Sequence, residues 1–187
     1  MDKTTREAMF SSKDLEWGTP QHFFHRLEDK FGKFTLDPCS NQSNYKVRKH
    51  FTEEDDGLSQ DWGGNNVFMN PPYGRVIKNW IKKAYEEGCK EDTTVVALIP
   101  ARTDTRYWHD YVMKAQAIYF VKGRLKFGNG SNSAPFPSAV VVFNGEDSGF
   151  PAMGMMKANE EKRKKSSRRP PSQRRSRTSD DGQGCYV

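Results

Sequence analysis

Cysteine is scarce in this sequence of 187 residues, which contains only Cys39, Cys89 and Cys185. The number is odd, and there is neither a CxxC pair nor a Cys/His cluster. We therefore expect no disulfide framework, no metal site and a reducing compartment. Apolar stretches near membrane-span length are also missing, and Met1-Asp2-Lys3 leads into a polar segment. These absences predict neither export nor a membrane partner.

Excess positive charge is absent from most of the chain. The sequence has 30 Lys and Arg against 24 Asp and Glu, a net charge of +6. Residues 157–187 hold ten of the cations and four of the acids, so residues 1–156 are formally neutral. If that larger part binds nucleic acid, we expect it to do so through a local patch of charge.

The basic segment marks one end of the expected domain organisation. Residues 157–184 have almost no apolar side chains, too few to offset the entropy of ordering, and we expect residues 151–187 to form a disordered basic tail. Its Lys/Arg runs are typical of nonspecific nucleic-acid binding, of a nuclear localisation signal, or of a solubilising extension. Residues 1–16 are polar and turn-like, and we expect them to be loosely ordered. The remainder, 17–150, has the length for one domain with a sizeable core.

A glycine-rich cofactor loop is the last notable absence. Phe34-Thr35-Leu36 predicts the first strand of a sheet, yet Asp37-Pro38-Cys39-Ser40 follows it in place of GxGxxG or FxGxG. The carboxyl end of a strand is still the usual position of a cofactor loop. Asp37 either pairs with an ammonium group or caps the loop at residues 41–44, and the residues alone leave both open.

Apolar periodicity predicts alternating helices and strands in the rest of the domain. The expected helices are residues 20–31, 76–88 and 104–112, and the expected strands after the first are 46–51, 67–69, 93–99, 117–121 and 138–143. This alternation predicts one α/β domain, with a mostly parallel sheet, helices on both faces and an antiparallel final strand.

The chain is organised around Asn70-Pro71-Pro72-Tyr73, which directly follows the short apolar run at residues 67–69. The two prolines keep the backbone extended, so the carbonyls of Asn70 and Pro71 remain available as acceptors. Asn70 adds a side-chain carbonyl, and Tyr73 adds a flat ring. Two acceptors beside an aromatic face suit the binding of a planar amine, such as a nucleobase amino group flipped out of a duplex. The alternative is a Pro-Pro turn with Tyr73 as rim packing, and the four residues together favour the first interpretation.

Asn70-Pro71-Pro72-Tyr73 matches the (D/N/S)PP(Y/F/W) signature of S-adenosylmethionine-dependent amino-methyltransferases. From Trp17 to Phe143 the chain resembles the phage-type DNA N6-adenine methyltransferases, the Dam family of phages and prophages. The resemblance is carried in order by Trp17-Gly18-Thr19-Pro20, Asp37-Pro38-Cys39-Ser40, Asp56-Gly57-Leu58 and Gly123-Arg124-Leu125-Lys126-Phe127. It implies a Rossmann-like methyltransferase fold and does not cover the tail.

The resemblance also implies roles for particular residues. The catalytic set is Asn70, Pro71, Pro72 and Tyr73, and the S-adenosylmethionine-binding set is Trp17, Thr19, Asp37, Pro38, Cys39, Asp56 and Leu58. In this interpretation Asp56 accepts a hydrogen bond from the cofactor adenine and Leu58 covers its ring. By spacing alone Trp17 is a core residue at the helix entry, and three of the four acids at 53–56 form a solvated face.

A long polar segment at residues 123–137 separates the last two expected strands. Arg124 and Lys126 are its cations, and we expect them to contact DNA phosphates, while Asn129 or Asn132 reaches base edges. The alternative is a mobile hairpin loop. The match of Gly-Arg-Leu-Lys-Phe to the family favours the functional interpretation.

Together these features predict a monomeric, metal-independent enzyme that methylates N6 of adenine in double-stranded DNA with S-adenosylmethionine. We expect it in the cytoplasm of a bacterium or phage-infected host, or in the nucleus of a eukaryotic cell. N4-cytosine methylation is the rival activity, because the same acceptors would hold either amino group. A catalytically silent DNA-binding protein is the rival from another class.

Overall fold

The computed structural model describes residues 18–127, 133–145 and 149–159. Trp17, Asn129, Asn132 and the tail beyond residue 159 lie outside these ranges. The elements in chain order are α2 (Gln21–Phe31), β1 (Asn66–Met69), α3 (Ile77–Gly88), β2 (Thr94–Pro100), α4 (Arg106–Asp110), the 3₁₀ helix η1 (Val112–Lys114), β3 (Ala117–Lys122), β4 (Ser138–Phe143) and β5 (Ala152–Lys157). The alternation of helices and strands confirms the predicted α/β class.

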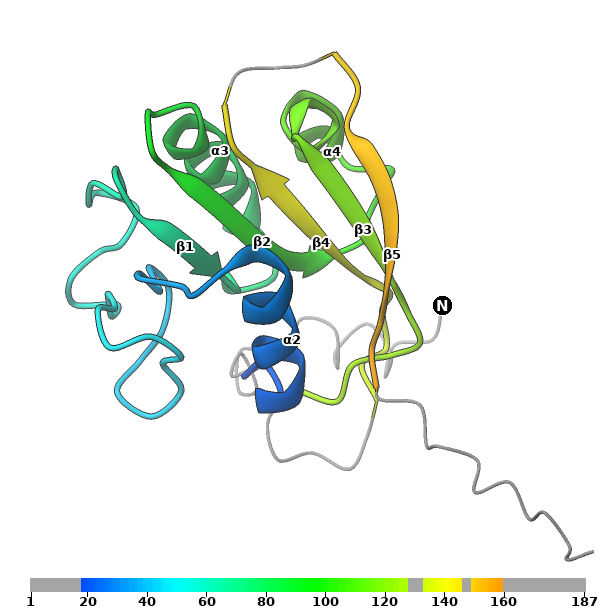
Figure 1. Cartoon of the computed structure of the whole chain (residues 1–187), viewed down its shortest axis with the longest axis horizontal. Helices are drawn as coiled ribbons and strands as arrows, with labels where there is room; N and C mark the ends of the chain where they lie inside the picture. The colour runs from blue at the N-terminus through cyan, green and yellow to red at the C-terminus, as the bar shows by residue number, and fades with distance from the viewer. Residues whose placement is uncertain (1–17, 128–132, 146–148, 160–187) are drawn as a thin grey trace, which may run out of the picture.

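The five strands form one sheet in the order β1-β2-β4-β3-β5 (Figure 1). β1 pairs with β2 in parallel, β4 is antiparallel to both β2 and β3, and β5 is parallel to β3. Four strands therefore run in one direction and only β4 runs against them. The predicted antiparallel strand is correct, but it is not the last strand. By pairing, the sheet is mixed, because half of its four strand pairs are antiparallel.

β5 was not predicted, because Ala152–Lys157 lies in the segment assigned to the disordered tail. The strand pairs with β3 over its whole length, from Ala117 opposite Ala152 to Lys122 opposite Lys157. Gly154 fits there because a Cβ would lie 2.5 Å from the Tyr119 ring. The folded domain therefore extends beyond residue 150, at least to the end of this strand at Lys157.

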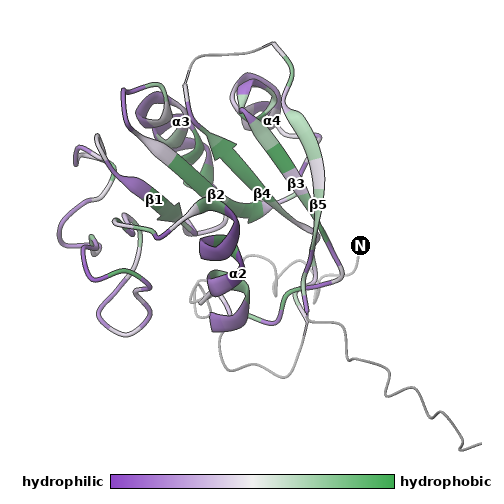
Figure 2. Cartoon of the chain, in the orientation of Figure 1, coloured by the Kyte–Doolittle hydropathy of each residue, from purple (hydrophilic) through white to green (hydrophobic). Residues whose placement is uncertain are grey.

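Helices cover both faces of the sheet, with α3 and α4 on one side and α2 on the other (Figure 1). Side chains alternate along β2, so that Val95, Ala97 and Ile99 pack with α3 and α4, whereas Val96 and Leu98 pack with α2. Figure 2 shows β2 and β4 as strongly apolar strands in the middle of the sheet. This double burial explains why residues 93–99 read as a continuous apolar run.

Two predicted strands are reduced to single bridges. Leu36 bridges to Val67, and Asp37 bridges to His50, but neither residues 34–36 nor residues 46–51 form a strand. The segment at 46–51 contains Lys46, Arg48 and Lys49, so it has no alternating apolar face to bury. Residues 37–65 instead form an irregular loop beside β1 (Figure 1).

Candidate active site

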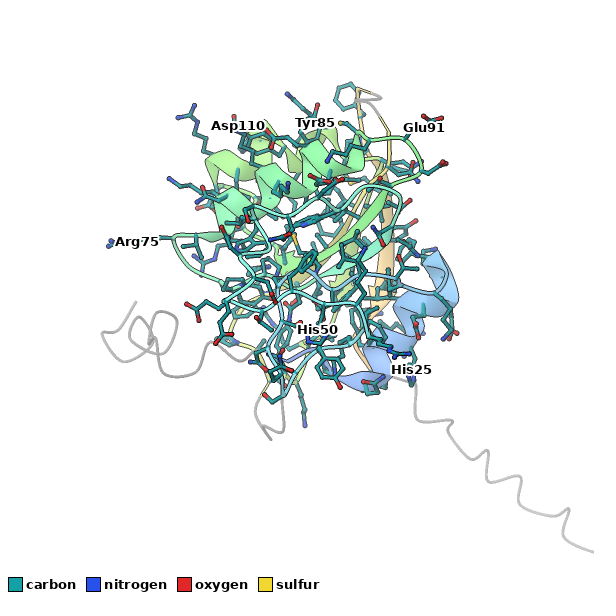
Figure 3. The ribbon with its side chains drawn as sticks, turned by 90° about the vertical axis from the view of Figure 1, so that its left-hand side faces the viewer. His25, His50, Arg75, Tyr85, Glu91 and Asp110 are labelled. Atoms are coloured by element: carbon teal, nitrogen blue, oxygen red, sulfur yellow. The ribbon has the colours of Figure 1, made fainter. Side chains whose placement is uncertain are left out.

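A cavity of about 510 Å³ opens at the carboxyl end of β1. Its wall comes from three stretches that are separated in sequence: the entry to α2, the irregular loop after Leu36, and the chain from the end of β1 to the first turn of α3. The predicted site residues that line it are Thr19, Asp37, Pro38, Cys39, Asp56, Leu58, Asn70, Pro71 and Pro72. The fold thus brings together the cofactor and catalytic segments that the motifs indicated. Figure 3 looks onto the side where the loop carrying His50 crosses the molecule.

Asn70 follows β1 directly, and its side chain is fixed by Tyr73. The Tyr73 hydroxyl donates to Asn70 Oδ1 at 2.8 Å. Burial raises the pKa of Tyr73 far above its usual range, so the hydroxyl stays protonated and remains a donor. This bond holds the Asn70 carboxamide with its oxygen toward the Tyr73 hydroxyl. The Asn70 backbone N–H is in turn directed at the Cys39 sulfur, which connects the two segments of the site.

The ring of Tyr73 packs against the segment that carries the predicted DNA contacts. It lies edge-on to Phe136 at 5.4 Å and to Phe127 at 6.2 Å between ring centroids. Tyr73 does not line the cavity itself. Stacking on an extruded base would therefore require the exposed part of the ring, or a rotation of it away from Phe136.

Asp37 is a buried carboxyl on the cavity wall, with 3% of its surface exposed. Burial raises its pKa from 3.8 to about 6, although backbone hydrogen bonds from Lys46 and Cys39 act in the opposite direction. The Lys46 N–H donates to Asp37 Oδ2 at 3.1 Å. Two backbone hydrogen bonds, Asp37 N–H to Lys49 and Phe51 N–H to Asp37, hold the loop in place. Because these hydrogen bonds only partly offset the burial of the carboxylate, a cationic ligand would stabilise its charged form.

Two hydroxyl groups on the cavity wall are buried without a partner among the described residues. They are Thr19 Oγ1, at the entry to α2, and Ser40 Oγ, in the loop after Asp37. Buried hydroxyls are normally hydrogen-bonded, so each has an unused capacity that a polar ligand can satisfy. Thr19 was predicted as a site residue, whereas Ser40 was only part of the quoted motif.

Asp56-Gly57-Leu58 packs directly against Pro38 at the edge of the cavity. A Cβ on Gly57 would lie 1.9 Å from the Pro38 carbonyl oxygen, so only glycine allows this approach. The Gly57 carbonyl accepts a hydrogen bond from the Trp62 indole N–H at 2.9 Å. Asp56 is exposed and has a left-handed backbone, with φ 49°. Gly57 was not predicted as a functional residue, although its place between Asp56 and Leu58 could have indicated it.

Arg124 and Lys126 lie outside the cavity. Both side chains are exposed, and they alternate with the buried Leu125 and Phe127. This alternation directs the two cations to solvent while Phe127 reaches Tyr73. The predicted cofactor residue Trp17 lies outside the described residues.

No cluster of three or more His, Cys, Asp or Glu residues in the described ranges is arranged to hold a metal ion. None of the described helices is long and apolar enough to cross a membrane.

Comparison with known proteins points to one family. The family model described as "DNA N-6-adenine-methyltransferase (Dam)" matches residues 5–164. A DNA N-6-adenine-methyltransferase of Haemophilus phage HP1 is 36% identical over 121 residues, covering 64% of this chain and 69% of the relative. The enzyme of the same name from Escherichia phage T1 is 31% identical over 114 residues, 60% of this chain but only 47% of the relative. The putative methyltransferase YfdM of Escherichia coli K12 is 34% identical over 64 residues, 31% of this chain and 70% of the relative.

Proposed function

The chain belongs to the DNA N-6-adenine-methyltransferase (Dam) family, and on this basis we propose that it transfers a methyl group from S-adenosylmethionine to N6 of adenine in double-stranded DNA. The observation that carries the proposal is the single cavity shared by Asn70-Pro71-Pro72 and the loop residues Asp37 and Asp56. A methyl transfer needs the amine acceptor site and the donor site to adjoin each other.

Asn70 and Pro71 supply the chemistry at the amine. Asn70 Oδ1 and the Pro71 carbonyl accept hydrogen bonds from the two N–H groups of the target amine. These bonds favour a pyramidal nitrogen whose lone pair points out of the base plane. S-adenosylmethionine, when bound, supplies a methyl carbon that is already activated by the sulfonium. In the proposed reaction the N6 lone pair would form the new C–N bond as the C–S bond of the donor breaks, and the amine would then lose a proton to water. The hydrogen bond from Tyr73 keeps the oxygen of Asn70, and not its NH₂, in the acceptor position.

The wall of the cavity fits the charges and surfaces of S-adenosylmethionine. The buried Asp37 suits the ammonium group, and the unpartnered Thr19 hydroxyl suits a polar group of the amino-acid end. Pro38 and Cys39 shape the same wall beside Asp37. Asp56 and Leu58, farther along the same irregular loop, would hold the adenine amino group and cover its ring.

We assign the DNA contacts to residues outside the cavity. Arg124 and Lys126 are exposed cations on the segment that also holds Tyr73 through Phe127. We assign them to phosphates that flank the target base, and Tyr73 to stacking on that base. The hydrogen bond between Tyr73 and Asn70 supports assigning both residues to the entry of the extruded adenine.

The decisive test is nucleoside analysis after incubation of unmethylated duplex DNA with labelled S-adenosylmethionine. We expect label in N6-methyladenine. Asn70→Ala is the matched control and should lower turnover by roughly two to three orders of magnitude, with cofactor affinity nearly unchanged. Label in N4-methylcytosine would replace the substrate assignment. DNA binding without label in any nucleoside would support a silent binding protein.

A further inference from the structure

We propose that Lys46 binds the α-carboxylate of the cofactor's amino-acid end and makes the site selective for a donor that carries this carboxylate. The inference rests on the proposed function and adds a residue to it. Lys46 lies outside the motifs of the family resemblance, and its place on the cavity wall became visible only in the structure.

The charge of the cavity wall limits where a carboxylate can lie. Asp37, Glu53 and Asp56 line the cavity, and Lys46 is its only Lys or Arg among the described residues. S-adenosylmethionine carries two cationic groups, the sulfonium and the ammonium, and one carboxylate. The acids suit the cationic groups and repel the carboxylate, so Lys46 is where the negative end is stabilised.

Lys46 is held between Asp37 and the start of α2. Its backbone N–H donates to Asp37 Oδ2 at 3.1 Å, and its Nζ donates to Gln21 Oε1 at 3.2 Å. Gln21 is the first residue of α2, and Thr19 lies two residues before it. The ammonium of Lys46 therefore lies near the amino end of an eleven-residue helix, where unpaired backbone N–H groups also favour an anion.

Further donors are available on the same wall. Thr19 and Ser40 each have a buried hydroxyl without a partner among the described residues. No described carboxylate lies within 4.0 Å of the Lys46 ammonium to form an ion pair. Burial lowers the pKa of Lys46, although the charge of Asp37 acts against this. A partly desolvated cation on the same cavity wall as two unpaired hydroxyls is a suitable carboxylate site.

Ligands that differ only in the carboxylate test the proposal. S-adenosylmethionine and decarboxylated S-adenosylmethionine would be titrated into the full chain by calorimetry. We expect the wild-type chain to prefer the carboxylated ligand by roughly tenfold to a hundredfold, the range of a hydrogen bond to a charged group. Lys46→Met should lose this preference by weakening the carboxylated ligand alone. Lys46→Arg, which retains the charge, should keep most of it.

Lys49→Met is the matched control. Lys49 is an exposed lysine on the same segment, it does not line the cavity, and its Nζ lies 3.4 Å from Asn65 Oδ1. We expect it to leave both affinities unchanged. Equal weakening of the two ligands by Lys46→Met would show a structural role and overturn the inference, as would a preference that survives the substitution. A wild-type chain that binds neither ligand would overturn the proposed function itself.

Discussion

Replacing Asp37 by Asn is expected to stabilise the free protein at neutral pH while weakening its cofactor binding. In the folded chain, burial raises the pKa of Asp37 from 3.8 to about 6. The folded state therefore keeps its proton over a pH range in which the unfolded chain has already lost it. The free energy of unfolding therefore decreases as the pH rises through this range, and the full loss of stability is reached above the folded-state pKa of Asp37.

The two pKa values give the size of the effect. Their difference corresponds to about 3 kcal/mol of unfolding free energy at pH 7.5, and to about half of that at pH 5. Asn has nearly the same shape and keeps one oxygen for the backbone hydrogen bond from Lys46 at 3.1 Å. Because it carries no charge, it avoids the penalty. The same loss of charge removes the proposed partner of the ammonium group and should weaken cofactor binding by roughly tenfold or more.

Urea unfolding of both proteins between pH 5 and 7.5, with calorimetric titration of S-adenosylmethionine, measures the two effects. Asp56→Asn is the control, because Asp56 lies on the same cavity but is exposed, and Asn tolerates its left-handed backbone. We expect no pH-dependent gain from it. The reasoning is refuted if Asp37→Asn is less stable than the parent at pH 7.5, or if the difference does not shrink at pH 5.

Three further predictions concern catalysis, closure of the cavity and the tail. Tyr73→Phe removes the hydroxyl that donates to Asn70 Oδ1 but keeps the ring, so we expect turnover in a steady-state assay to fall roughly threefold to tenfold while DNA affinity is retained. An unchanged rate would contradict the role of Tyr73 in orienting Asn70. Gly57→Ala would place a Cβ 1.9 Å from the Pro38 carbonyl oxygen, so we expect titration to show a cofactor affinity at least about tenfold lower. Normal affinity would mean that the segments around Gly57 and Pro38 can separate freely. Deleting residues 160–187 removes nine Lys and Arg, so the slope of log DNA affinity against log salt concentration should flatten by about 0.9 for each lost phosphate contact. Identical slopes for the full and shortened chains would exclude a DNA-binding tail.

Local sequence was sufficient for several parts of the fold. Apolar spacing and a terminal glycine predicted a helix at 20–31, and α2 spans Gln21–Phe31 with Gly32 as its C-cap. The run at 67–69 followed by two prolines predicted a strand end, and β1 ends at Met69. These signals are local because periodicity, proline and glycine act on the backbone of their own segment. The order of motifs along the chain also identified the family, which the match over residues 5–164 confirms.

Contacts between distant segments could not be read in the same way. The sequence of β5, from Ala152 to Lys157, has no alternating apolar face of its own, and it is a strand because β3 provides a partner. The approach of Gly57 to Pro38 and the position of Lys46 beside α2 likewise arise from chain segments that meet only in the folded molecule. Sequence alone thus determined the local elements and the motif residues. The tertiary structure determined which strands pair and which charges share the cavity, because both depend on neighbours brought together by folding.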